Sequence, residues 1–196
     1  FPHLNIYKKS NQKSSFMILS IKYLIVIFAI TALASPVKIK DTQLIKNDGI
    51  NIVLSLDASG SMKHNDLDSQ DRTKNRFDVV KDIVKDFIEK RKADNIALVI
   101  FGDWVMMASP LSFDKEAQKD IIDYLEVEMA GNKTSLLDSI ASSVNILKEQ
   151  KAKSNVIIVL SDGEDTASKI PLNLIIKLLQ KHNIKAYTIG IGGSNQ

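Results

Sequence analysis

Apolar residues are unevenly spread along this 196-residue chain, with one long run near the start and shorter runs at intervals afterwards. Four of the shorter runs are rich in Val, Ile and Leu, a pattern typical of strands buried on both faces of a sheet. These strands are predicted over residues 50–56, 96–101, 155–160 and 186–191. A short edge strand is expected over residues 104–108, ending near Pro110.

Between the strand-like runs, apolar residues recur at the spacing of an amphipathic helix, with Lys and Asp in the intervening positions. Helices are predicted over residues 76–91, 114–126, 135–149 and 172–181. Asp114 is a suitable N-cap for the second of them. Strands that alternate with helices predict an α/β fold, a Rossmann-like doubly wound and mostly parallel sheet covered by helices on both faces.

The long run, Phe16–Ala34, has nineteen residues and is nearly all apolar, which predicts a membrane helix. We therefore expect a basic polar segment at residues 1–15, a membrane helix at 16–36 and a domain at 47–196. Two interpretations remain open for the helix. It is either retained as an anchor or is a signal-like segment cleaved at the small-residue pattern Ala32-Leu33-Ala34.

Charge is also unevenly distributed, and its pattern bears on topology and on partners. The net charge of +3 combines six lysines and no acid in residues 1–40 with 20 basic and 23 acidic residues in 41–196. Four lysines precede the uninterrupted apolar part and two follow it, which favours an N-terminal side in the cytoplasm and a domain outside the inner membrane. The slightly acidic domain argues against nucleic-acid binding. The lack of cysteine excludes disulfides, thiol nucleophiles and zinc–cysteine sites.

Three predicted loops at the carboxyl ends of the strands carry oxygen-bearing side chains, namely Asp57, Ser59 and Ser61, then Thr134, then Asp162. In parallel sheets these strand ends are where ligands bind. Carboxylates and hydroxyls suit Mg²⁺, with Mn²⁺ and Ca²⁺ as alternatives. Two carboxylates would neutralise such an ion and leave it able to accept a further carboxylate. We therefore expect it to bind an acidic residue of a partner protein.

The pattern Asp-x-Ser-x-Ser at residues 57–61, with Thr134 and the pair Asp162-Gly163, resembles the metal-ion-dependent adhesion site of von Willebrand factor A (VWA) domains. The resemblance covers roughly residues 47–193. It implies that these five positions bind the metal, and that the domain is a protein-interaction module and not an enzyme.

Within that family, the chain is most similar to the Bacteroides-aerotolerance (Bat) membrane proteins. The runs that carry this resemblance are Phe1–Leu4, Ala34–Pro36, Asn75–Phe77, Ser109–Leu111 and Tyr187–Gly190. It implies a retained membrane helix, and a fold that continues past Gly193, so that this chain would be a truncated copy. It also implies a role in stress tolerance or aerotolerance, with other Bat-type proteins and a MoxR-type AAA+ ATPase as partners.

Two other functions stay open. A Mg²⁺-dependent phosphohydrolase would use Asp57 as its nucleophile, but a haloacid-dehalogenase-type site would need a second acid where Ser59 stands. A structural assembly protein would carry the metal site without using it.

Several other side chains are weaker candidates. Four acidic residues are weaker candidates for contact with the metal or the partner, namely Asp103, Asp138, Glu164 and Asp165. Solvated loop charges are expected at Asp66, Asp68 and Asp71, because the EF-hand Gly and Glu are missing. Two roles are open for Trp104, Met106 and Met107. They either form an apolar contact patch beside the metal or pack along the edge strand, and we favour the packing role.

Overall fold

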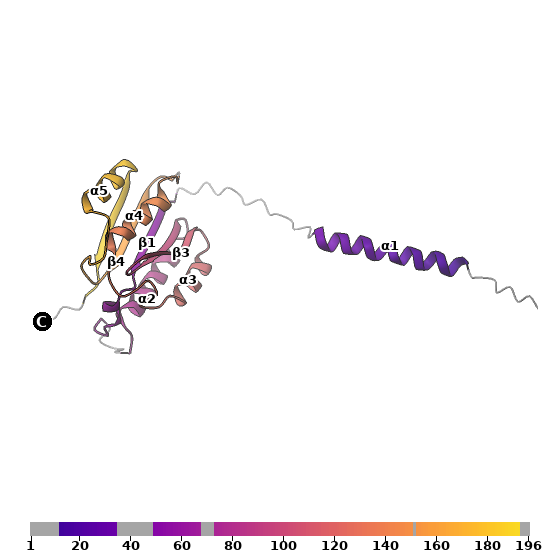
Figure 1. Cartoon of the computed structure of the whole chain (residues 1–196), viewed down its shortest axis with the longest axis horizontal. Coiled ribbons are helices and arrows are strands. Elements are labelled where there is room, and N and C mark those ends of the chain that lie inside the picture. The colour runs from indigo at the N-terminus through magenta and orange to yellow at the C-terminus, as the bar shows by residue number, and fades with distance from the viewer. Residues whose placement is uncertain (1–11, 35–48, 68–72, 151, 193–196) are drawn as a thin grey trace, which may run out of the picture. The chain divides into compact units, whose positions relative to one another are not determined.

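The computed structural model describes residues 12–34, 49–67, 73–150 and 152–192 (Figure 1). The chain divides into two units, Phe1–Ile45 and Lys46–Gln196. The first contains the helix α1 (Gln12–Ala34), and the second contains the sheet and the remaining helices.

Helix α1 has the length and composition of a membrane-spanning segment. Its 23 residues extend about 34 Å, against a hydrocarbon core of about 30 Å. Its apolar stretch Phe16–Leu33 has a mean hydropathy of 2.4. Ser20 and Thr31 donate their hydroxyl hydrogens to carbonyls one turn earlier, so these polar groups are satisfied within the helix. A segment of this kind anchors a protein in a membrane or directs its export.

The second unit is built on a five-stranded sheet in the order β3-β2-β1-β4-β5. Its strands are β1 (Asn51–Asp57), β2 (Asn95–Phe101), β3 (Val105–Ser112), β4 (Asn155–Ser161) and β5 (Ile184–Gly190). Neighbouring strands pair in parallel except for β3, which runs antiparallel to β2 at the sheet edge. The predicted mostly parallel sheet is confirmed.

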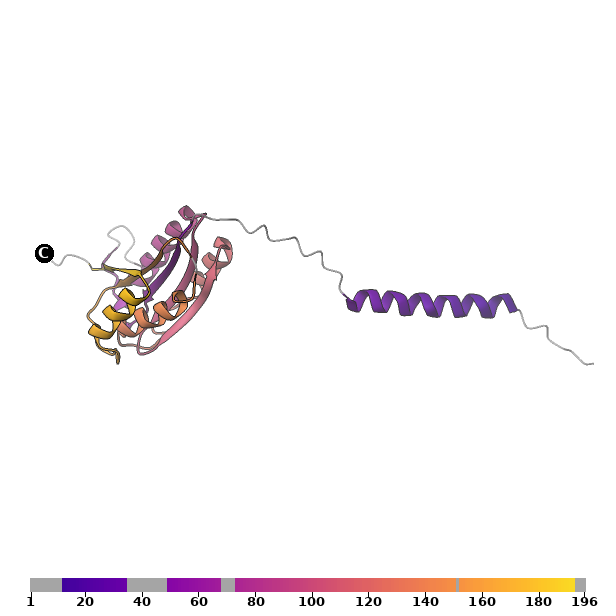
Figure 2. The same ribbon diagram turned by 90° about the horizontal axis from the view of Figure 1, so that it is seen from above.

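Helices cover both faces of this sheet (Figure 2). They are α2 (Arg76–Lys90), α3 (Lys115–Asp123), α4 (Leu136–Leu147) and α5 (Leu172–Lys181). Alternate β1 residues face opposite layers: Leu54 packs in the cluster that contains α2 and α3 residues, and Val53 packs in the cluster that contains α4 and α5 residues. Because apolar side chains pack on both faces of the sheet, the sequences of the central strands are almost continuously apolar.

The structure differs from the sequence expectations mainly at three places, besides shifts of one or two residues in the bounds of other helices and strands. The edge strand β3 continues past Pro110 to Ser112, because an edge strand with shifted register tolerates proline. Helix α3 ends at Asp123 instead of residue 126. The expected polar loop after β1 contains a 3-10 turn, η1 (Gly60–Lys63).

Candidate metal site

The candidate site lies where the carboxyl ends of two adjacent strands meet. Asp57 is the last residue of β1, and Ser161 is the last residue of its neighbour β4. Asp162 follows directly after β4. Because β1 and β4 are parallel, both ends lie at the same sheet edge, so the loops that follow them come together.

Asp57 is fully buried and is held by two neutral donors. Its Oδ1 accepts the Ser59 amide hydrogen over 2.9 Å, and its Oδ2 accepts the Ser161 hydroxyl hydrogen over 2.5 Å. Burial raises the pKa of Asp57 despite these hydrogen bonds, and the nearby charge of Asp162 adds to the rise. A carboxylate in this environment is stabilised by a cation.

Ser59 and Ser61 place two hydroxyls beside the second carboxylate. Their Oγ atoms are 3.0 Å apart, and the Ser61 Oγ donates to Asp162 Oδ1 over 2.6 Å. Adjacent ligands of an octahedral magnesium ion at 2.0–2.1 Å are about 2.9 Å from each other. The two serine hydroxyls are hydrogen-bonded to each other, and their spacing is compatible with two neighbouring ligands of Mg²⁺, which binds hydroxyl and carboxylate oxygens.

Two loop contacts bring this turn close to the segment before α4. The Gly60 amide donates to the Asn132 carbonyl over 3.0 Å. A Cβ atom on Gly60 would lie 1.8 Å from the Asn132 side-chain oxygen. Glycine at position 60 therefore allows the two loops to approach each other.

Thr134, the fifth predicted ligand, is buried in the loop before α4. A Cβ built on Gly163 would be 3.9 Å from the Thr134 hydroxyl, so this hydroxyl lies over the Asp162-Gly163 loop. The Thr134 carbonyl also accepts the amide hydrogens of Thr166 and Ala167. Direct contacts link Asp57, Ser59, Ser61 and Asp162, and Thr134 is adjacent to them. Binding of a metal ion by these residues stays a prediction.

Three of the secondary candidates hold loops in place. Asp138 accepts amide hydrogens of Lys169 and Ile170, which ties the loop after β4 to the start of α4. Asp103 accepts the Asn132 amide hydrogen over 2.8 Å. Asp165 accepts the Ser168 amide hydrogen over 3.1 Å. These contacts position the loops of the candidate site.

Arg76 was not predicted as part of the site. Its Nη1 donates to Asp162 Oδ2 over 2.5 Å, and its Nε and Nη2 donate to the two oxygens of Asp66. Asp66 and Asp162 raise the pKa of Arg76, and Arg76 lowers the pKa of Asp66. Asp66 is exposed, as expected for a loop charge, but it is also paired with Arg76, which the sequence did not predict; Asp68 and Asp71 lie outside the described residues. The sequence did contain a signal for this contact. Arg76 is the first residue of a helix, where a positive charge is unfavourable next to the helix dipole, and such a cation is expected to pair with an anion.

Ser161 was also missed as a site residue. It is the residue before Asp162 and ends the strand next to β1. Recognising its contact with Asp57 requires the strand order, which residue patterns do not supply.

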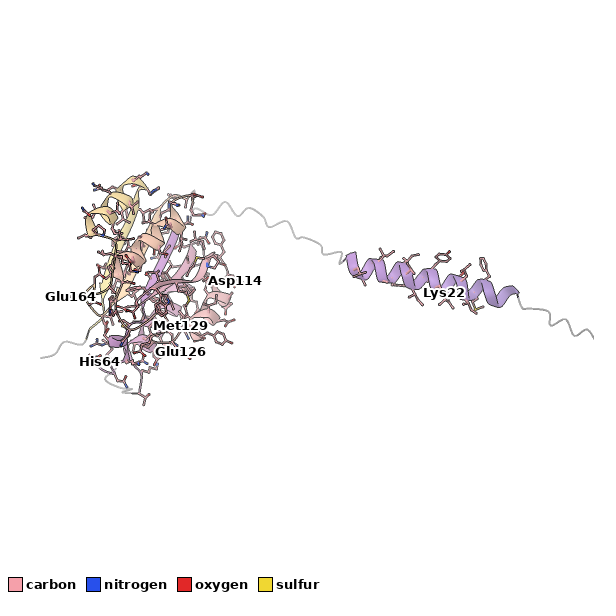
Figure 3. The ribbon with its side chains drawn as sticks, viewed as in Figure 1. Lys22, His64, Asp114, Glu126, Met129 and Glu164 are labelled. Atoms are coloured by element: carbon pink, nitrogen blue, oxygen red, sulfur yellow. The ribbon has the colours of Figure 1, made fainter. Side chains whose placement is uncertain are left out.

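The side chains expected to pack along the edge strand are exposed instead. Trp104, Met106 and Met107 are 56%, 36% and 54% exposed. The Trp104 amide donates to the Ala130 carbonyl, which places Trp104 beside the loop that carries Met129, itself 39% exposed. His64 and Met129 lie in the lower part of the domain in Figure 3.

Residues 52–164, which include all five predicted ligands, match the family of the von Willebrand factor type A domain. The chain is 33% identical over 181 residues to an uncharacterized protein of Borreliella burgdorferi, covering 92% of this chain and 52% of that protein. The chain thus spans about half the length of the curated relative it matches.

Two solved structures show the same fold. An aerotolerance-related membrane protein from Bacteroides fragilis has a TM-score of 0.65 at 18% identity, covering 74% of this chain and 68% of that one. The protein BatB from Bacteroides thetaiotaomicron has a TM-score of 0.63 at 17% identity, covering 76% and 73%. The family match, the parallel sheet and the loops at its carboxyl end agree, and the chain belongs to the von Willebrand factor type A domain family.

Proposed function

We propose that this chain is a metal-dependent protein-interaction module. Asp57, Ser59, Ser61, Thr134 and Asp162 would hold Mg²⁺, with Mn²⁺ or Ca²⁺ as alternatives. The observation that supports this most is the pair of buried carboxylates, Asp57 and Asp162, with the two serine hydroxyls adjoining them. Buried carboxylates are costly unless a cation compensates them; Arg76 pairs with Asp162, whereas Asp57 has only neutral donors.

The partner in this proposal supplies a carboxylate. Two aspartates balance the charge of a divalent ion, and hydroxyl ligands add no charge. The bound ion keeps its affinity for oxygen anions and can take an Asp or Glu side chain from outside as a further ligand.

We place the domain on the periplasmic side of a bacterial inner membrane, anchored by α1. The apolar helix and the lysines before it support this orientation. The resemblance to Bat proteins extends the proposal to an envelope complex linked to stress or aerotolerance. Other Bat-type proteins and a MoxR-type AAA+ ATPase are the candidate partners.

Binding is favoured over phosphohydrolysis because the second acid of a haloacid-dehalogenase-type site is missing. Asp57 would be the nucleophile of such a site, and Ser59 stands where the second acid is needed.

Crosslinking in membranes followed by affinity capture tests the proposal. In Mg²⁺ the wild-type chain is expected to retain a crosslinked partner that is lost in EDTA and in Ser61→Ala, because both remove metal ligation. Ser142→Ala in α4 is the matched control and should behave as wild type. Equal capture in EDTA would indicate a structural assembly role without use of the metal.

The exposed Trp104 supplies a second prediction. An aromatic side chain beside the site is expected to be buried against the partner, so Trp104→Ser should reduce capture roughly ten-fold or more. Its Mg²⁺ affinity should equal that of wild type in calorimetric titration, because Trp104 is not a predicted ligand. Phe113→Ser is the control, since Phe113 is 53% exposed just past the opposite end of β3. Equal losses in both variants would contradict a specific contact at Trp104.

A further inference from the structure

We propose that Arg76 is a built-in competitor of the divalent ion, which lowers the metal affinity of the site and keeps the loaded site attractive to a carboxylate. This inference rests on the proposed function. It assigns a positioning and charge-balancing role to a residue outside the five predicted ligands.

Arg76 and Ser61 between them engage both oxygens of Asp162. The Ser61 hydroxyl contacts Oδ1 over 2.6 Å and the Arg76 guanidinium contacts Oδ2 over 2.5 Å. The Asp162 side chain is fully buried and the Arg76 side chain is only 14% exposed, so solvent screens their interaction little. A divalent ion must share this carboxylate with a cation already in place.

Asp66 keeps the guanidinium in that position. It accepts two parallel hydrogen bonds from Arg76, from Nε over 2.7 Å and from Nη2 over 2.5 Å. The Arg76 amide also donates to the His64 carbonyl over 2.8 Å. We call the two parallel hydrogen bonds between Arg76 and Asp66 the fork. Because the fork fixes the guanidinium, Arg76 cannot move away from an arriving ion without breaking several hydrogen bonds.

The charges around the site explain how Arg76 would favour binding of a partner's carboxylate. With Asp57, Asp66, Asp162 and Arg76 all ionised, a bound divalent ion makes the site neutral. Without Arg76 the loaded site would carry a net negative charge and would repel a partner's carboxylate. Arg76 therefore weakens binding of the ion while favouring binding of the carboxylate.

Calorimetric titration of the full chain with MgCl₂ tests this inference. Arg76→Gln removes the competing charge and should raise the Mg²⁺ affinity about ten-fold. Asp66→Asn leaves the charge of Arg76 uncompensated and should lower the affinity. Both variants break the same fork, so a purely structural role for the fork would shift both affinities in the same direction.

The outcomes separate the two proposals. Absence of Mg²⁺ binding by the wild-type chain would overturn the proposed metal site, and this inference with it. Binding by the wild type with shifts of the same sign, or no shift, in the two variants would overturn this inference alone. If Arg76→Gln fails to fold, Asp66→Asn still decides, because an unchanged or raised affinity would contradict competition. In the capture assay, Arg76→Gln should retain less partner than wild type despite binding Mg²⁺ more tightly.

Discussion

Asp57→Asn is expected to abolish Mg²⁺ binding and, at the same time, to stabilise the metal-free domain. The variant removes one of the two carboxylates of the candidate site, and we expect the affinity for Mg²⁺ to fall by more than about 100-fold, beyond the loss typical of residues that only support a ligand. In EDTA the same change removes a buried charge whose donors, the Ser59 amide and the Ser161 hydroxyl, are neutral. The free energy of unfolding should rise by about 0.5–2 kcal/mol.

The pH dependence gives the stability effect a definite sign. The raised pKa of Asp57 means that, between the ordinary carboxyl value and the raised one, the folded state binds more protons than the unfolded state. The contribution of Asp57 to stability therefore falls as pH rises through that window. The stability advantage of Asp57→Asn over wild type should grow with rising pH and then level off.

Thermal and urea unfolding in EDTA at several pH values, together with calorimetric Mg²⁺ titration, measure both effects. Asp120→Asn, which changes an exposed carboxylate on α3, is the control and should leave both quantities near the wild-type values. A variant at Asp57 that still binds Mg²⁺ would remove this residue from the site. A less stable variant would mean that the Asp57 charge is compensated in the metal-free fold.

Gly102→Ala should damage both the fold and the site. Gly102 is buried just after β2, and a Cβ there would lie 2.4 Å from the Ala130 carbonyl oxygen and 2.6 Å from the Gly131 carbonyl oxygen. These are backbone atoms, so the loop that leads to Thr134 has to move. The Gly102 carbonyl also accepts the Ser135 amide hydrogen over 2.9 Å, which couples the shift to the start of α4.

We expect Gly102→Ala to lower the free energy of unfolding by about 1–3 kcal/mol, as overpacked sites do. Its Mg²⁺ affinity should fall roughly ten-fold, the low end of the loss seen when a supporting residue is changed. Gly190→Ala is the matched control, because a Cβ there meets no atom within 4 Å among the described residues. Denaturant unfolding and calorimetry on the two variants check this. Wild-type stability and affinity in Gly102→Ala would show that the loop adapts freely.

The central sheet was predictable because its strands are buried on both faces. Burial on two sides requires nearly every residue of β1, β2 and β4 to be apolar, so each appears as a run rich in Val, Ile and Leu, interrupted in β1 by Ser55. The edge strand β3 was harder to delimit, since one side of an edge strand lacks a neighbour and its residues follow no strict pattern. Pro110 therefore indicated an end that the structure does not have.

The sequence by itself determined the α/β class, the apolar segment near the start and the loops that carry Asp57, Ser59, Ser61, Thr134 and Asp162. These features depend on local periodicity and on residues at the ends of apolar runs, which are visible without coordinates. Only the tertiary structure decided which loops touch. The strand order sets β4 beside β1, and this pairing brings Ser161 to Asp57 across 104 positions of sequence.

The same holds for Arg76, which meets Asp162 across 86 positions of sequence. Its place at the start of α2 marks it as a cation that needs an anionic partner, but the sequence offers many carboxylates and does not distinguish among them. Long-range pairing depends on how helices and strands pack around a shared core, and local residue patterns carry little information about that packing. The competition at Asp162 is therefore a property of the folded domain.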